Sequence, residues 1–414
     1  MKSKFFFTLF ISMNLSAQDL NEKKILAEEA SFQITNSITT HYSQTLHNIF
    51  KYGYLLSDSS KEALKQKGFI FNKKLTSSSR PQNLDQYTDD GFFRFHYTLQ
   101  GSDAVSPIDS NQNQIPDYVD LIMKTFKSIG NEYFDKLGYP RPPSDHYYTR
   151  LDNGGSDHYD IYIFNLESGY YGYVQAENYA NAESLFDKGD NEFSLNIKES
   201  RGMTTFMALR NNYKDFSGNE KNIIEVTSAH EFFHAIQYGY DGWEAGWLLE
   251  STAVFMEEFL YDSINDCYQF LKTFLEKPQL SIHHDTDRGY GSYIYFSYLD
   301  EHYVDDDFVK KVFINSVKYD SYDQDYSLRN LKEVVISNGL SFEKTMHDFF
   351  IANGVIDTSA ALKQYRYEEA ASFPVKSPTY KNIFNDLINS VINCFNKYFD
   401  FETRSSRKEF WYWQ

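Results

Sequence analysis

The chain has 414 residues, and 41% of them are hydrophobic, so it can bury a large core. Its 58 acidic residues outnumber its 40 basic residues, which gives a formal net charge of −18 at pH 7. This negative charge argues against nucleic acid or an anionic membrane surface as a partner, because both attract basic proteins. The two cysteines, Cys267 and Cys394, permit at most one disulfide and lack the spacing of a metal site.

The first residues have the pattern of a secretory signal peptide. Lys2 and Lys4 precede an apolar run over residues 5–13, and a small-residue cleavage site ends at Ala17. The run is shorter than the roughly 20 residues that a transmembrane helix needs, and no later stretch is long and apolar enough either. We therefore expect cleavage after residue 17 and a secreted or extracytoplasmic protein. The alternative is an N-terminus that stays in the membrane.

The predicted signal peptide is followed by a charged segment of helical pattern. Residues 18–80 show leucine, isoleucine and phenylalanine recurring every three or four positions through most of their length. The sequence leaves open whether this segment is an integral lobe or a removable pro-segment, and it contains no cysteine that could block a metal site. A polar stretch over residues 75–90 indicates a loop or linker.

The remaining chain has strand patterns first and helix patterns afterwards. Alternating or strongly β-branched and aromatic runs predict strands, and apolar residues at helical spacing predict helices. The expected strands cover residues 92–98, 160–164 and 193–197, and the expected helices cover residues 118–137 and nearly everything from about residue 222. This order indicates an α+β fold. We place the domain at residues 81–375, followed by a tail of unassigned role at residues 376–414.

The strongest functional signal is an H-E-x-x-H motif, which runs from His230 to His234. Apolar residues recur at helical spacing through residues 222–238, so we expect a helix that Asn222 caps and Gly239 ends. On this helix the two histidines lie one turn apart on one face, where both imidazoles can bind one cation. The competing interpretation is a structural helix with two surface histidines.

A zinc site of this kind needs a third protein ligand and one open position. Residues 247–258 are predicted to form a helix on which Glu250 lies among apolar residues. A carboxylate on an apolar face is unfavourable unless a cation or hydrogen bonds compensate it, so Glu250 is the expected third ligand. Glu257 is expected to orient a ligand histidine. Asp241 and Glu244 are weaker ligand candidates, and ordinary surface acids are the competing interpretation.

These segments resemble the gluzincin clan of zinc metallopeptidases, and more narrowly the secreted bacterial metalloproteases of that kind. The resemblance covers roughly residues 80–310. It is carried by residues 230–241, 247–253 and 290–293, and further upstream by residues 93–97, 109–120 and 170–173. It implies a zincin-like fold, in which the H-E-x-x-H helix lies beneath a mixed sheet and a second helix carries the ligand glutamate.

The resemblance also implies roles for individual residues. His230, His234 and Glu250 correspond to the zinc ligands, and Glu231 corresponds to the catalytic base. Many gluzincins have an acidic residue four positions after the ligand glutamate, where this chain has Val254. The partner that orients the histidine is therefore expected to be Glu257 instead.

The motif predicts hydrolysis of peptide bonds. Zinc polarises the scissile carbonyl and lowers the pKa of its bound water towards about 7. Glu231 then takes the proton and passes it to the leaving amine. The oxyanion needs a further donor, for which Tyr290 is the first choice because flanking glycines let the chain come close. An ordinary packed tyrosine is an equal alternative, and other donors in this stretch are His283, His284, Arg288 and Tyr293.

A second signal is a loop rich in aspartate and asparagine, whose oxygen ligands follow the spacing of an EF-hand-type calcium loop. The expected ligands are the side chains of Asp109, Asn111, Asn113, Asp117 and Asp120 and the main-chain carbonyl of Ile115. Such loops usually have glycine at the position of Gln114 and a bidentate glutamate at the position of Asp120. The loop predicts a structural calcium ion, and the alternative is an Asn/Asp-rich turn with a capping aspartate.

The patterns together favour a secreted zinc-dependent endopeptidase that acts on peptide or protein substrates, with Glu231 as general base. The alternative class is a non-catalytic, calcium-stabilised surface or binding protein with a degenerate zincin fold. The intact Glu231 argues against that alternative, because degenerate sites commonly lose the base. A glycan-active enzyme is a third interpretation, but no carboxylate pair stands out for that chemistry. The oligomeric state and the side-chain specificity do not follow from the sequence.

Overall fold

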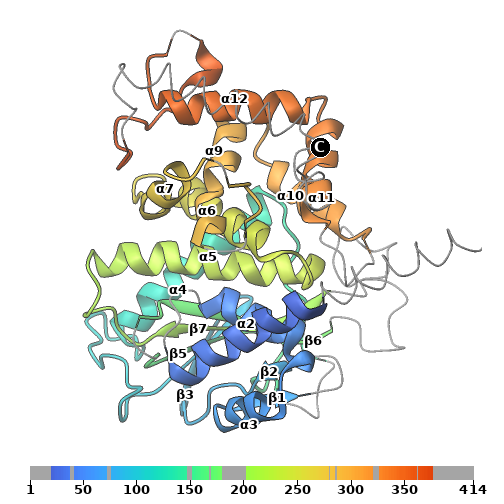
Figure 1. Cartoon of the computed structure of the whole chain (residues 1–414). Coiled ribbons are helices and arrows are strands. Elements are labelled where there is room, and N and C mark those ends of the chain that lie inside the picture. The colour runs from blue at the N-terminus through green and yellow to red at the C-terminus, as the bar shows by residue number, and fades with distance from the viewer. Residues whose placement is uncertain are drawn as a thin grey trace, which may run out of the picture.

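The computed structural model describes residues 20–37, 42–71, 76–146, 152–166, 169–179, 202–278, 280–284, 287–319, 326–360 and 362–375. The predicted signal peptide, the strand expected at residues 193–197, Cys394 and the tail from residue 376 lie outside the described residues. The described part combines a five-stranded mixed sheet with helices α2 to α12, in agreement with the predicted α+β class. Figure 1 shows the sheet below the long helix α5 and most of the later helices above it.

The sheet has the strand order β3-β4-β5-β7-β6. Its inner strands β4, β5 and β7 are parallel, whereas the edge strands β3 and β6 run antiparallel to their neighbours. The bounds are β3 (Gln86–Asp90), β4 (Phe93–Tyr97), β5 (Tyr159–Phe164), β6 (Gly172–Tyr179) and β7 (Met203–Arg210). The strands expected at residues 92–98 and 160–164 are thus confirmed.

Three strands of this sheet were not predicted from the sequence. β6 follows glycine-rich residues and was not among the expected strands. β3 lies inside the stretch expected to be a loop, because it is a polar edge strand with no buried residue. β7 is buried at all eight positions, so its sequence lacks the alternation that marks a half-exposed strand. A separate pair of short strands, β1 (Phe69–Phe71) and β2 (Thr76–Ser78), belongs to the N-terminal segment.

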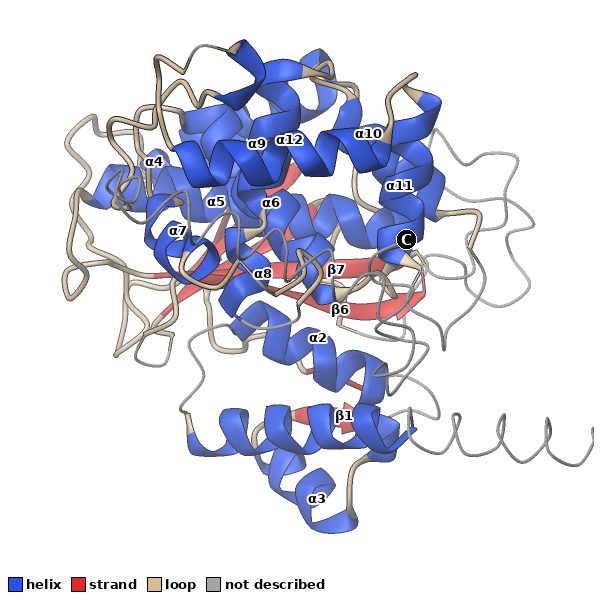
Figure 2. Ribbon diagram, turned by 45° about the horizontal axis from the view of Figure 1, so that its top comes forward, coloured by secondary structure: helices blue, strands red, loops and turns tan. Residues whose placement is uncertain are grey.

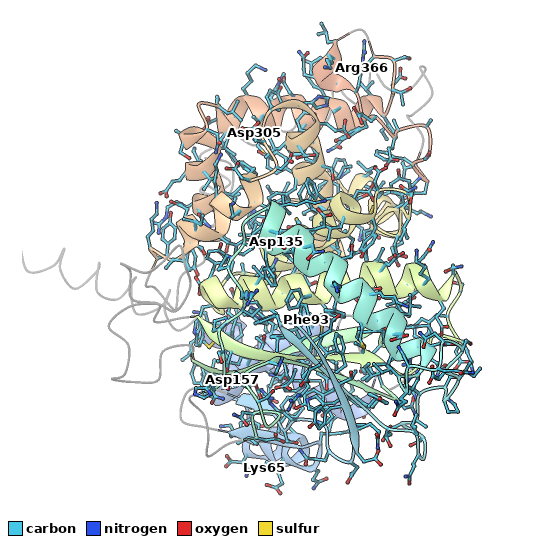
Figure 3. The ribbon with its side chains drawn as sticks, turned by 180° about the vertical axis from the view of Figure 1, so that it is seen from behind. Lys65, Phe93, Asp135, Asp157, Asp305 and Arg366 are labelled. Carbon is cyan, nitrogen blue, oxygen red and sulfur yellow. The ribbon has the colours of Figure 1, made fainter. Side chains whose placement is uncertain are left out.

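Helices α4 (Asp117–Gly130) and α5 (Glu220–Asp241) cover one face of the sheet, as Figure 3 shows from behind. α4 continues as a π-helical segment, Asn131–Lys136, and ends before Gly138, so the helix expected at residues 118–137 is confirmed. Phe232 of α5 lies in the centre of this layer. Its ring centroid is 5.1 Å from that of Phe93 on β4 and 5.8 Å from that of Phe126 on α4.

The helix that carries the H-E-x-x-H motif is longer than the sequence pattern indicated. Its N-cap is Asn219, whose side chain accepts hydrogen bonds from the main-chain N–H groups of Lys221 and Asn222, so the expected cap at Asn222 is wrong. Nor does the helix end at Gly239, which is buried inside its last turn. A Cβ atom there would lie 2.9 Å from Cδ of Pro143, so this glycine is required for close packing.

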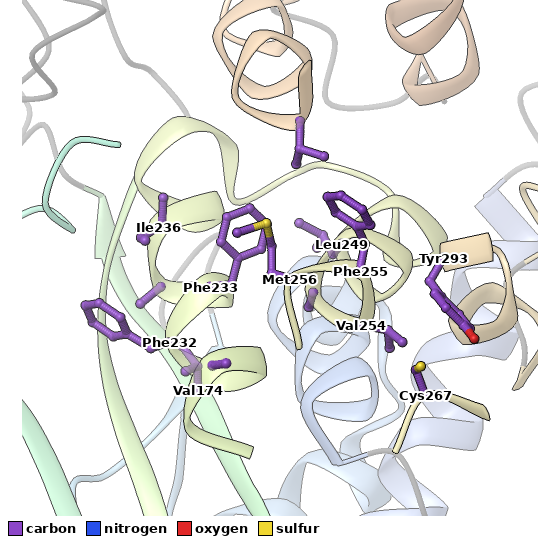
Figure 4. Packing of buried hydrophobic residues seen from close by; sticks show 14 of the residues in the cluster. Val174, Phe232, Phe233, Ile236, Leu249, Val254, Phe255, Met256, Cys267 and Tyr293 are labelled. Carbon is purple, nitrogen blue, oxygen red and sulfur yellow. The ribbon is translucent and has the colours of Figure 1, made fainter. Parts of the chain in front are cut away.

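The second predicted helix, over residues 247–258, is confirmed as α6 (Gly246–Tyr261). It packs along α5, and Figure 4 shows buried side chains of both helices that belong to one core. The later helices build on this pair: α7 (Tyr268–Leu275), α8 (Asp287–Gly291), α9 (Tyr293–His302), α10 (Phe308–Ser316), α11 (Ser327–Ser337) and α12 (Phe342–Val355). No helix in the described ranges is long and apolar enough to cross a bilayer.

The N-terminal segment covers the opposite face of the sheet. It contains a helix over residues 20–36, α2 (Tyr42–Tyr52) and α3 (Asp58–Gln66), so its predicted helical character is confirmed. Its apolar side chains form a second core cluster with four residues of the sheet. The members from the sheet are Tyr162, Tyr173, Phe206 and Ala208, and those from the helices include Ala27, Ala30, Ile34, Leu46, Ile49 and Leu64. In Figure 2, α2 lies beside β6.

Arg80 joins the end of this segment to the sheet. Its guanidinium is buried and forms ion pairs of 2.5–2.6 Å with Asp145, Asp160 and Glu177. Burial raises the pKa of Asp145 to about 7, although Arg80 opposes this shift. Because three buried carboxylates share one cation, Arg80 holds the boundary of the predicted domain in place.

A half-buried carboxylate at the end of α9, that of Glu301, makes stability depend on pH. Burial and the nearby Glu368 and Asp300 raise the pKa of Glu301 from 4.5 to about 8, despite a hydrogen bond from the Glu368 main-chain N–H. The folded state therefore binds more protons than the unfolded state between these values, and stability falls as pH rises through this window. We expect Glu301→Gln to raise the melting temperature at pH 8 and to flatten its pH dependence, measured by thermal unfolding.

The matched control is Glu276→Gln, because Glu276 is an exposed carboxylate at the end of α7. It should leave the pH dependence of the melting temperature as in the wild type. If Glu301→Gln instead lowers the melting temperature at pH 8, the charged form of Glu301 stabilises the fold, contrary to the expectation.

Candidate metal centre

α5 and α6 bring two histidines and one glutamate to a single point. His230 and His234 lie one turn apart on α5, and their Nε2 atoms are 3.1 Å from each other. Oε2 of Glu250, which lies on α6, is 3.2 Å from Nε2 of His230 and 3.4 Å from Nε2 of His234. The three residues predicted as metal ligands thus form one cluster that fits a metal ion. Their side chains are buried, which excludes the interpretation as surface histidines and acids.

The hydrogen bonds of the two imidazoles indicate which nitrogen atoms are free to bind a metal. Nδ1 of His230 lies 2.5 Å from Oε1 of Glu257, and Nδ1 of His234 lies 2.7 Å from Oε1 of Gln237. A carboxylate or amide oxygen only accepts hydrogen bonds, so both Nδ1 atoms carry the proton. In the neutral form of each ring, Nε2 is then the atom that is free to bind a metal, and both Nε2 atoms face Oε2 of Glu250.

With neutral imidazoles these are three acceptor atoms, which repel one another at this distance unless a proton or a metal cation lies between them. Ligands at about 2.0–2.1 Å from a tetrahedral zinc ion are roughly 3.3 Å from each other. The three separations here, 3.1, 3.2 and 3.4 Å, agree with that value. The donor set of two imidazoles and one carboxylate is also one that zinc prefers. The residues therefore fit a zinc ion.

Gln237 is one member of this site that the sequence analysis missed. Besides accepting from His234, it donates through Nε2 to the main-chain oxygen of Leu249 at 3.0 Å and to Oγ1 of Thr252 at 2.8 Å. It therefore fixes the ring of His234 and ties α5 to α6 beside Glu250. Its position three residues after His234, on a face that the pattern indicated as buried, was the signal that could have identified it.

The predicted orienting role of Glu257 agrees with its hydrogen bond to His230. Burial raises the pKa of Glu257 to about 7, and the contact with His230 limits the rise. Burial acts on Glu250 in the same direction, but His234 and His230 outweigh it and lower the pKa of Glu250 well below its ordinary value. Glu250 is therefore the carboxylate that stays ionised at the centre of the cluster.

Glu231 lies next to the two histidines on α5 and is also buried. Burial raises the pKa of its carboxyl group, opposed by His230 and His234. Its Oε2 atom accepts a hydrogen bond of 2.9 Å from Oγ of Ser43, a residue of α2. A carboxylate with a raised pKa, beside a group of candidate metal ligands, has the properties of a general base.

Tyr290 lies beside the cluster. Its ring is parallel to that of His230, with centroids 6.2 Å apart, and its hydroxyl group interacts with Glu250. Two of the other donors considered in this stretch contact other residues. The hydroxyl group of Tyr293 interacts with Cys267. The guanidinium of Arg288 donates to the main-chain oxygens of Phe274, Leu280 and Ser281, so it holds a loop together.

Asp241 and Glu244, the weaker ligand candidates, lie away from the cluster. Their carboxylates accept hydrogen bonds from the hydroxyl groups of Tyr326 and Ser327. They therefore connect the end of α5 to the start of α11, and the structure does not place them at the metal centre.

The loop predicted to bind calcium folds around Asp120, whose side chain is buried. The side-chain amides of Asn111 and Asn113 donate to the Asp120 carboxylate, and Asp109 accepts from the main-chain N–H groups of Asn113 and Gln114. Gln114 has the left-handed conformation, with φ of 70°, that glycine usually supplies at this position. The loop thus closes on Asp120 through the amide nitrogens of Asn111 and Asn113, whereas a calcium ion would be bound by oxygen atoms.

Asp117 differs from the other predicted calcium ligands. Its carboxylate accepts hydrogen bonds from the main-chain N–H group and the hydroxyl group of Ser110, at 2.9 and 2.6 Å. It is the first residue of α4, so these bonds close the loop onto the helix. Ile115, the expected carbonyl ligand, donates its N–H group to Oδ1 of Asn113 at 2.8 Å.

Comparisons of the chain with family models, with curated proteins and with solved structures found no match. Its function is therefore inferred from the metal centre itself.

Proposed function

We propose that the chain is a secreted zinc-dependent endopeptidase with a zincin-like fold of the gluzincin type. One observation carries the proposal: two Nε2 atoms and one carboxylate oxygen converge at 3.1–3.4 Å while both Nδ1 atoms are held by acceptors. This arrangement leaves three lone pairs directed at one point, next to a buried carboxylate in position to act as base. The signal peptide pattern of residues 1–17 supports export.

Each residue has a distinct task in the proposed reaction. His230, His234 and Glu250 would hold zinc, which when bound polarises the scissile carbonyl and makes water more acidic. Glu231 would accept a proton from water as the water oxygen bonds to the scissile carbonyl carbon, and would transfer that proton to the nitrogen of the leaving amine as the C–N bond breaks. Tyr290 would donate a hydrogen bond to the oxyanion after turning from Glu250.

The test is the metal content and peptidase activity of the purified protein. We expect one zinc ion per chain, cleavage of an unfolded protein substrate, loss of cleavage with a chelator, and its recovery when zinc is added back. A folded protein that binds no zinc contradicts the proposal. Zinc without cleavage of any peptide would favour the alternative, a non-catalytic surface or binding protein.

We also propose that the loop from Asp109 to Asp120 binds a structural calcium ion. A ligand that binds only the folded state stabilises it, by about 1.4 kcal/mol at ten times its dissociation constant. We therefore expect millimolar calcium to raise the melting temperature of the wild type. Asp120→Asn should abolish this rise, because it removes the buried charge on which the loop converges.

Magnesium at the same concentration is the control for ionic strength in this measurement. Asp103→Asn is the matched variant, since Asp103 precedes the loop and its carboxylate accepts from the main-chain N–H of Asn165. If calcium raises the melting temperature of Asp120→Asn as much as that of the wild type, the ion binds elsewhere.

A further inference from the structure

Helix α2 of the N-terminal segment directs three polar side chains towards α5 and the loop that follows it. Ser43, His47 and Lys51 are spaced by four residues and therefore lie on one face of α2. They expose only 6%, 3% and 7% of their surfaces. Burial of an ammonium group and an imidazole is unfavourable without specific partners. This face of α2 therefore needs specific hydrogen-bond partners on α5 and on the loop that follows it.

Ser43 contacts the proposed catalytic base directly. Its hydroxyl group donates to Oε2 of Glu231 at 2.9 Å, although 188 residues separate the two in sequence. In the proposed reaction this carboxylate must accept its proton from water. The hydroxyl group of Ser43 therefore occupies one hydrogen-bonding position of the carboxylate that must accept this proton.

The next two turns of α2 attach it to the connection between α5 and α6. Nε2 of His47 is 3.0 Å from the main-chain oxygen of Glu244, and its Nδ1 is 3.1 Å from the hydroxyl group of Tyr238. Nζ of Lys51 donates to the main-chain oxygens of Trp243 and Glu244, at 3.0 and 3.1 Å. These contacts hold Ser43 over Glu231.

The opposite sides of α2 are apolar and fill both core clusters. Phe50 packs into the main core, with its ring 6.1 Å from that of Trp243, whereas Leu46 and Ile49 pack into the core on the other face of the sheet. α2 thus lies at the edge of the sheet, beside β6 and below α5 (Figures 1 and 2). It is positioned to close the metal centre from this side.

The metal centre is closed in this arrangement. Glu231, His230, His234 and Glu250 expose 8%, 9%, 1% and 2% of their surfaces. A peptide substrate has to reach both the metal and Glu231, so the groups that cover Glu231 have to move before it can bind. α2 contributes to this closure through Ser43, so access to Glu231 from this side requires that α2 moves away.

We propose that α2 is an autoinhibitory helix, so that the folded chain is a latent enzyme that becomes active when α2 undocks. The latency part of this inference rests on the proposed function, because an enzyme can be latent only if the centre hydrolyses peptides. The occlusion itself rests on the contacts of Ser43, His47 and Lys51. It can therefore be tested by a property other than activity.

The experiment compares the zinc-loaded full chain with its Lys51→Met variant. This substitution keeps an apolar side chain of similar length but removes the ammonium group that donates to Trp243 and Glu244, so α2 should undock more often. We expect zinc to pass to excess dipicolinate about tenfold to a hundredfold faster, and cleavage of a short fluorogenic peptide to rise in parallel. Lys65→Met is the control, since Lys65 is exposed on α3 and pairs with Glu62.

The outcomes separate the occlusion from the peptidase function. Faster zinc loss without cleavage by either protein supports the occlusion and contradicts the peptidase function. Cleavage by the wild type at a rate that Lys51→Met does not change, together with unchanged zinc loss, overturns the autoinhibition and leaves the peptidase function standing. If Lys51→Met does not fold, Ser43→Ala provides the same comparison, because it removes only the hydroxyl group that contacts Glu231.

Discussion

Glu231→Gln is expected to abolish peptide hydrolysis while the protein keeps its zinc. Glutamine preserves the shape of the side chain and can still accept the hydrogen bond from Ser43, but it cannot take a proton from water. The loss of a general base typically reduces the rate by about 10²–10⁴-fold. Zinc content, measured by elemental analysis, should equal that of the wild type, because His230, His234 and Glu250 are unchanged.

The control for this variant is Glu225→Gln on the same helix. Glu225 forms an ion pair with Lys221 one turn away and has no contact with the histidines, so its removal should leave both zinc and hydrolysis unchanged. Full activity of Glu231→Gln would show that another group is the base. Equal inactivity of wild type and variant, with zinc present in both, is the result expected of a non-catalytic protein.

Local sequence patterns predicted the elements that carry the site. The H-E-x-x-H spacing and the apolar residues around it placed His230 and His234 on one helix, and the structure confirms both the helix and its partner α6. Glu250 was identified because a carboxylate on an apolar face needs compensation, and it lies within 3.4 Å of both histidines. Each of these inferences depends on neighbours within a few turns of helix.

The features that the sequence did not predict depend on contacts between distant segments. Ser43 reaches Glu231 from a helix 188 positions away, and no local pattern marks that serine among the others. The cap at Asn219 replaces the predicted cap at Asn222 because the helix begins one turn earlier than its apolar pattern. β7 was not predicted because it is buried on both faces, so its sequence lacks the alternation of apolar and polar residues that marks a half-exposed strand. The second face of the sheet is covered by α2 and its neighbours.

Glu250, Glu257 and Gln237, which all contact the two histidines, are expected to differ in how strongly their substitution weakens zinc binding. Glu250→Gln removes the charged ligand, so it should weaken binding by more than the about 10–100-fold that is typical when an orienting partner is lost. Glu257→Gln and Gln237→Leu should stay within that range, because each leaves all three ligand atoms in place. Competition with a chelator of known affinity measures all three variants on one scale.

Glu258→Gln is the control on α6, since its carboxylate accepts from Sγ of Cys267 and does not contact either histidine. The order of the three effects also decides between two arrangements of the site. Glu250 and Glu257 both lie within hydrogen-bond distance of His230, on opposite sides of its ring. If Glu257→Gln weakens zinc binding more than Glu250→Gln does, then the ring of His230 is turned in solution, Glu257 is the ligand, and the proposed assignment of Nε2 and Nδ1 is reversed.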